Sequence, residues 1–80
     1  SVKMENVPFY PNPVENILFV QDGMSDIFPL SIYDSRGRLV KYVGVPMSEI
    51  DVSNLIQGVY FVLYRNKSSQ GEATFKMMKE

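Results

Sequence analysis

Residues that interrupt helices recur closely along this chain of 80 residues. Proline breaks a helix interior and glycine weakens one, so their repetition divides the chain into short segments. If any segment forms an amphipathic helix, we expect it to be the stretch after Pro46. Short segments bounded by turn residues predict a β-sandwich or a barrel. The five prolines and five glycines are Pro8, Pro11, Pro13, Gly23, Pro29, Gly37, Gly44, Pro46, Gly58 and Gly71.

The segments between these residues have the alternation and composition of strands. Leu30 and Ile32 share one face of a segment in which polar and apolar residues alternate. The turn at 35–38 contains Gly37, which can adopt a positive φ, and it predicts a hairpin over residues 30–43. Residues 58–64 are apolar on both faces, which predicts a strand in the centre of a sheet.

We therefore expect an all-β fold, an immunoglobulin-like antiparallel β-sandwich of about seven strands. One short helical turn is expected around residues 53–57. Residues 1–6 are expected to be the remnant of a linker, because the chain starts at Ser1 and looks like part of a longer protein, and residues 7–80 to be one domain. The strands are expected near residues 7–10, 16–21, 29–34, 38–43, 49–52, 58–65 and 72–78.

Composition argues against several classes of function. The net charge is −1, and the eight basic residues are scattered, so no electrostatic footprint for nucleic acid or an anionic membrane is visible. Histidine and cysteine are absent, which removes the commonest general base, the commonest metal ligand and thiolate chemistry. The longest apolar run, residues 59–64, is far shorter than the ~20 residues of a membrane-spanning helix. We expect no enzyme activity, no catalytic or metal-binding residue, no cofactor, no nucleic-acid partner and no direct membrane insertion.

Two groups of residues predict structural corners. Tyr60, two residues after Gly58, fits a tyrosine corner, in which the hydroxyl bonds back to the chain a few residues upstream while Leu55 closes the edge of the core. Pro11, Asn12 and Pro13 predict an edge strand that ends in a stiff corner, with Asn12 bonded to nearby backbone groups.

The last residues predict a terminal strand at the edge of a sheet. Lys76 and Lys79 are three positions apart, so in a strand they point to opposite faces. Met77 should anchor the strand in the core, and Met78 should face outward. Strand alternation predicts an inward-facing set: Leu18, Val20, Leu30, Ile32, Ile50, Val52, Leu55, Tyr60, Val62, Phe75 and Met77.

Five motifs in order resemble the type IX secretion C-terminal sorting domain, also known as the Por secretion system C-terminal domain. The resemblance spans about residues 7–79 and rests on the order and spacing of the motifs together. They are Phe9-Tyr10-Pro11-Asn12-Pro13; Ile32 to Val40 with Asp34 and Gly37 in its turn; Ile50-Asp51-Val52-Ser53-Asn54-Leu55; Gly58-Val59-Tyr60-Phe61-Val62; and Lys76-Met77-Met78-Lys79.

The resemblance implies a seven-stranded sandwich at the C-terminus of a larger cargo protein. It implies that the cargo reaches the periplasm of a Gram-negative cell and then crosses the outer membrane to the surface or the exterior. The implied partners are the type IX translocon, its outer-membrane shuttle protein and, in many members, a cell-surface sortase that removes the domain. We expect the binding residues to be Lys76, Met77, Met78, Lys79 and Glu80, offered on an exposed strand edge by β-augmentation.

Two alternatives remain at this point. A carbohydrate-binding β-sandwich needs a planar row of exposed aromatic residues, for which Phe28, Tyr33, Tyr42 and Tyr64 are candidates. A passive module like a fibronectin domain needs no partner at all.

Overall fold

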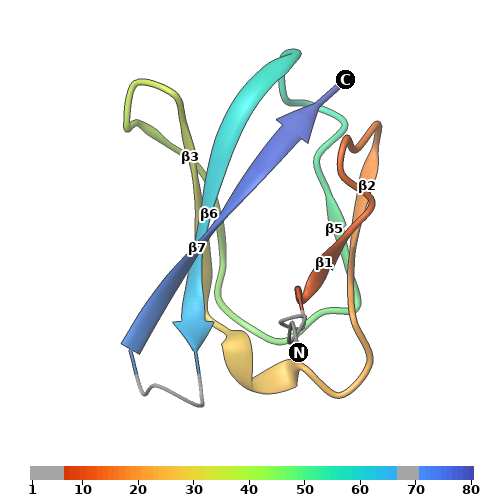
Figure 1. The fold of residues 1–80 in the computed structure, drawn as a ribbon, viewed down its shortest axis with the longest axis vertical. Helices are drawn as coiled ribbons and strands as arrows, with labels where there is room; N and C mark the ends of the chain where they lie inside the picture. The colour runs from red at the N-terminus through yellow and green to blue at the C-terminus, as the bar shows by residue number, and fades with distance from the viewer. Residues whose placement is uncertain (1–6, 67–70) are drawn as a thin grey trace, which may run out of the picture.

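Seven strands in two sheets form the fold in the computed structural model, which describes residues 7–66 and 71–80 (Figure 1). The expected linker remnant at residues 1–6 lies outside the described residues. The strands are β1 (Phe9–Tyr10), β2 (Ile17–Val20), β3 (Leu30–Asp34), β4 (Leu39–Val43), β5 (Glu49–Asp51), β6 (Gly58–Asn66) and β7 (Gly71–Lys79).

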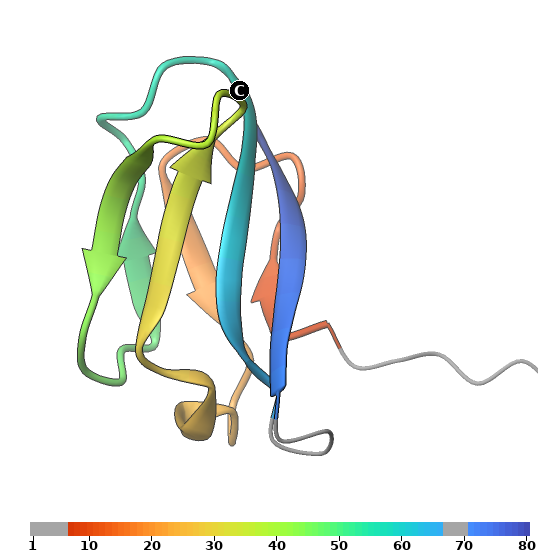
Figure 2. The same ribbon diagram turned by 90° about the vertical axis from the view of Figure 1, so that its left-hand side faces the viewer.

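The two sheets face each other as the layers of a sandwich. One has three strands in the order β1-β2-β5, and the other has four in the order β4-β3-β6-β7. Figure 2 shows the four-stranded sheet from its outer side, and all pairings between the strands are antiparallel. The predicted all-β antiparallel sandwich is therefore confirmed, and β6 lies between β3 and β7 as the apolar character of both its faces predicted.

The prediction of a helical turn around residues 53–57 is wrong. The Asp51 carboxylate accepts hydrogen bonds from the Ser53 N–H at 2.9 Å and the Ser53 hydroxyl at 2.6 Å. The Leu55 N–H then bonds to the Val52 carbonyl at 3.0 Å. These contacts make a tight turn that does not continue into a helix, with the Asp51 side chain bonded to the local backbone. A 3₁₀-helix, η1, lies instead at Ser25–Ile27, where Ile27 is buried.

The hydrophobic core fills the space between the two sheets, and strand alternation predicted most of it but not Phe9, Val14, Ile27, Phe28 and Val43. Nine of the eleven residues expected to point inward are buried, and Leu55 and Phe75 are partly buried against the same cluster. The nine are Leu18, Val20, Leu30, Ile32, Ile50, Val52, Tyr60, Val62 and Met77.

A candidate recognition strand and the motifs that hold it

The side chains of β7 alternate between the core and the outer face of the four-stranded sheet. Met77 is 0% exposed and Lys79 is 8% exposed, whereas Met78 on the outer face is 41% exposed. Lys76 and Glu80 are exposed too. The predicted roles of Met77 as an anchor and Met78 as an outward residue are confirmed, and the two lysines do point to opposite faces.

Lys79 was expected to bind a partner, but its side chain is buried. It lies directly opposite Gly58 on β6, and its Nζ donates a hydrogen bond to the Glu80 main-chain oxygen at 2.7 Å. A lysine stem can be buried while its ammonium reaches a polar partner, and here that partner lies at the end of the strand. In the folded domain Met77 and Lys79 therefore present little side-chain surface, and the accessible members of the set are Lys76, Met78 and Glu80.

The outer edge of β7 is closed at its end by the segment that follows β1. The side-chain amide of Asn12 donates to the Lys76 carbonyl at 2.9 Å, and its oxygen accepts from the Met78 N–H at 2.8 Å. Val14 continues the contact as a short parallel bridge, with its N–H bonded to the Met78 carbonyl and its carbonyl to the Glu80 N–H, both at 2.8 Å. Val14 is fully buried, so its side chain also joins the core.

This closure corrects two expectations about the terminal strand. The Asn12 amide bonds to residues 64 and 66 positions away, and not to nearby backbone. The edge at Lys76–Glu80 is also not freely open, because Asn12 and Val14 already satisfy several of its backbone groups. Sequence reasoning missed Val14 entirely, and the only signal for it was an apolar residue directly after Pro13. The corner after the edge strand β1 is present as predicted.

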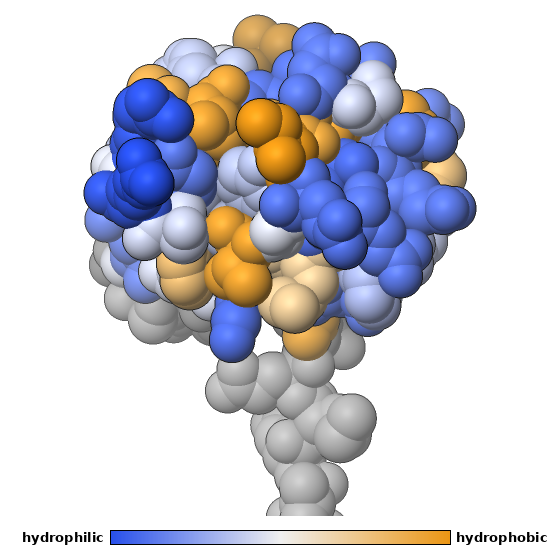
Figure 3. All heavy atoms as spheres, turned by 90° about the horizontal axis from the view of Figure 1, so that it is seen from above, coloured by the Kyte–Doolittle hydropathy of each residue, from blue (hydrophilic) through white to orange (hydrophobic). Residues whose placement is uncertain are grey.

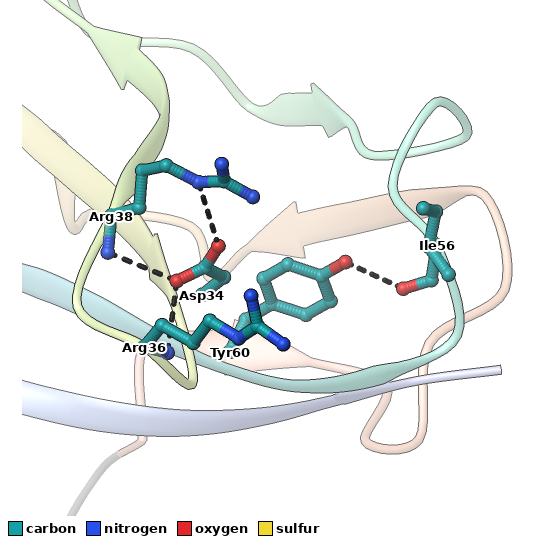
Figure 4. A network of polar contacts seen from close by, with 5 residues as sticks. All are labelled: Asp34, Arg36, Arg38, Ile56 and Tyr60. Atoms are coloured by element: carbon teal, nitrogen blue, oxygen red, sulfur yellow. Dashed lines mark hydrogen bonds and ion pairs between the residues drawn. The ribbon is translucent and has the colours of Figure 1, made fainter.

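The predicted tyrosine corner is present at the start of β6. The Tyr60 hydroxyl donates to the Ile56 carbonyl at 2.6 Å, as Figure 4 shows. Gly58 has a φ of 154°, a backbone conformation that favours glycine, so the entry into β6 depends on it. The bond between Tyr60 and Ile56 fixes the loop between β5 and β6 to the start of β6, the strand that pairs with β7.

The Asp34 carboxylate organises the turn between β3 and β4, beside two backbone hydrogen bonds from the Asp34 and Gly37 N–H groups to the Arg38 and Asp34 carbonyls. Oδ1 of Asp34 accepts hydrogen bonds from the N–H groups of Arg36 and Arg38, both at 2.9 Å, and its Oδ2 lies 3.2 Å from Arg38 Nε (Figure 4). Gly37 has a φ of 83°, which the turn requires. The hydrogen bond from the Arg38 N–H lowers the pKa of Asp34 below its ordinary value. The N–H of Arg36 and the charged guanidinium of Arg38, which also bonds to the carboxylate, lower it further.

Comparison with known families decides between the remaining interpretations. The profile of the family described as the secretion system C-terminal sorting domain matches residues 8–80. The chain belongs to this family. No curated protein and no solved structure matched the chain. It is a C-terminal sorting domain of the type IX, or Por, secretion system, a family without enzymatic activity whose members accompany secreted or cell-surface cargo.

The geometry gives the motifs of this sorting domain structural roles. The P-N-P motif closes the edge of β7, Asp34 and Gly37 build the hairpin, and Leu55, Gly58 and Tyr60 form the corner before β6. Asn12 bonds directly to the terminal strand, and Gly58 and Tyr60 pair with it, whereas Asp34 and Gly37 lie in the turn between β3 and β4. Within 7–66 and 71–80, no group of three or more acidic residues is placed to hold a metal ion, and no helix is long and apolar enough to cross a membrane.

The aromatic row that a carbohydrate-binding module needs is not formed by its four candidates. Phe28 is buried, and Tyr64 packs edge-on against Phe9 with ring centroids 5.2 Å apart. Tyr42, on β4, is 61% exposed, and Tyr33, on β3, is half-buried. At the end of the sandwich drawn in Figure 3, hydrophobic residues are interspersed with hydrophilic ones.

Proposed function

We propose that this sorting domain directs a larger cargo through the type IX translocon across the outer membrane, after binding to an outer-membrane shuttle protein. The cargo passes through the periplasm on its way to the cell surface or the exterior. Family membership supports an interaction with the secretion machinery, and the translocon and the shuttle protein are the components that we propose read this domain.

The surface that we propose is read lies at the end of β7 and consists of Lys76, Met78 and the following residue, Glu80. One observation carries this proposal: the anchoring and the outward side chains of the strand are separated by its alternation. Met77 and Lys79 hold the strand on the core side, so the outward residues are free to contact a partner without loss of the fold. Methionine is a flexible, polarisable contact, and the lysine ammonium adds a charge beside it.

Fusion of residues 1–80 to a neutral reporter tests the function directly in a host with a type IX system. We expect the reporter to be exported, and export equal to that of the unfused reporter would contradict the sorting function. Deletion of residues 76–80 is a weaker test, because it also removes Met77 from the core and the hydrogen bonds to Asn12 and Val14.

A double substitution separates recognition from stability. Lys76→Ser with Met78→Ser changes two exposed residues of β7, and Val40→Ser with Tyr42→Ser is the matched control on β4, at the other edge of the same sheet. Circular dichroism should show that both variants fold. We expect export to be lost in the β7 variant and kept in the β4 variant, and normal export of a folded β7 variant would contradict the proposed surface.

We also propose that a cell-surface sortase removes the domain after export. Mass spectrometry of the exported reporter tests this point. A reporter that lacks the sandwich supports removal, and a reporter that retains all of residues 7–80 contradicts it.

A further inference from the structure

The N-terminal half of the β7 edge differs from the half that Asn12 and Val14 close. β7 has nine residues and pairs with β6 from Gly58↔Lys79 to Asn66↔Gly71 without a shift in register. The N–H groups of Met78 and Glu80 point away from β6, since they bond to Asn12 and Val14. By the two-residue alternation of a strand, the N–H groups of Glu72, Thr74 and Lys76 point to the same side.

The described residues offer no backbone partner to this part of the edge. The backbone hydrogen bonds from the N-terminal segment reach the Met78 carbonyl and the Glu80 N–H, and the Asn12 side chain reaches no further than the Lys76 carbonyl. The Thr74 side chain is exposed, as are those of Glu72 and Lys76. A long, straight edge strand with outward backbone groups is a template for another strand.

The other edge of the sheet is a poorer template. β4 has five residues, and its pairing with β3 is interrupted by a register shift between Ile32 and Tyr33. A bulge of this kind twists an edge and disfavours addition of another strand. The regular edge is therefore the one that belongs to the terminal strand.

We infer that the open edge of β7 at residues 72–76 binds an extended segment of a protein of the secretion machinery as an added β-strand. This inference rests on the proposed function and specifies how the secretion machinery binds the domain. The same edge already accepts an extended backbone at Val14, which pairs with it in parallel at Lys79. The segment Pro11–Pro13 with its Asn12 contacts limits the added strand at Lys76, so the partner pairs over a short stretch.

The side chains beside this edge favour a partner of a particular charge pattern. Glu72, Thr74 and Lys76 lie on the outer face in that order along the strand. A partner strand that places a basic residue opposite Glu72, a β-branched residue opposite Thr74 and an acidic residue opposite Lys76 gains favourable cross-strand pairs. Backbone hydrogen bonds supply most of the affinity in this mode, and the side chains supply selectivity.

Proline at Thr74 tests the inference, because it removes the outward N–H and leaves the hydrogen bonds to β6 in place. Thr74→Val is the matched control, since valine keeps both the N–H and the branched side chain. Both are made in the reporter fusion of residues 1–80, and folding is checked by circular dichroism. We expect export of the folded Thr74→Pro fusion to fall by at least about tenfold and that of Thr74→Val to stay near wild type, as expected for strand addition.

A second proline, Glu72→Pro, keeps the test decisive if Thr74→Pro does not fold, because residue 72 lies nearer the end of the strand. Export of either folded proline variant within about twofold of the wild-type fusion would overturn strand addition as the binding mode. If both variants unfold, amide hydrogen exchange of the wild-type domain decides, because protected amides at Glu72 and Thr74 would already be bonded and would overturn the inference, whereas rapid exchange would support an open edge. Failure of the wild-type fusion to be exported would instead contradict the proposed function, so the two failures are distinguishable.

Discussion

Replacing Asn12 with alanine removes the side-chain part of the closure on β7. The change deletes the 2.9 Å bond to the Lys76 carbonyl and the 2.8 Å bond from the Met78 N–H. A hydrogen bond contributes a net ~0.5–1.5 kcal/mol, so the upper limit for the pair is about 3 kcal/mol. Because Asn12, Lys76 and Met78 are all exposed, water can replace the lost partner, and we expect the free energy of unfolding to fall by about 1–2 kcal/mol.

Thermal and urea unfolding followed by circular dichroism measures this loss. In a domain of this size, 1 kcal/mol corresponds to a shift in Tm of ~4–8 °C, so a loss of about 1–2 kcal/mol should lower Tm by about 4–16 °C. Hydrogen exchange adds a local measurement, because the Met78 amide loses its acceptor in Asn12→Ala and should exchange faster.

Asn16→Ala is the matched control for this experiment. Asn16 is exposed, and the hydrogen bond that it makes to the Val52 N–H comes from its main-chain carbonyl, which alanine keeps. We expect the control to change the free energy of unfolding by less than about 0.5 kcal/mol. If Asn12→Ala behaves like Asn16→Ala and the Met78 amide stays protected, the closure contributes nothing to stability and the reasoning is refuted.

Three further substitutions test the core, the corner and the hairpin. Val62→Ala should cost ~2–3 kcal/mol in a denaturation series, since Val62 is 0% exposed, and a cost under ~0.5 kcal/mol would mean that β6 is not central. Tyr60→Phe should lower the free energy of unfolding by ~1–2 kcal/mol, because the Ile56 carbonyl loses its donor; an unchanged value would contradict a stabilising corner. The folded-state pKa of Asp34 is lowered, so the stability it adds is present above its ordinary pKa and is lost as the pH falls through the lowered value. Asp34→Asn should therefore flatten the decline in stability below pH ~4, and an identical acid profile would contradict the role of Arg38 and its neighbours in holding this carboxylate.

Much of the sandwich follows from local properties of the sequence. The spacing of proline and glycine, the two-residue alternation and the turn at Gly37 predict strands, faces and a hairpin, because each depends on neighbouring residues alone. Tyr60 and Ile56 are only four positions apart, so their bond was also predictable. The same alternation assigned Met77 to the core and Met78 to the surface.

Tertiary structure decided how the terminal strand is supported and which part of it is accessible. Asn12 bonds to residues more than 60 positions away, Val14 bridges to Lys79, and the ammonium of Lys79 bonds to the Glu80 main chain while the side chain stays buried. Alternation says which face a residue occupies but not what lies along the edge of its strand. That neighbour is set by the packing of the two sheets, which brings the connection between β1 and β2 against the edge of the opposite sheet, so it is a long-range outcome that no short pattern encodes.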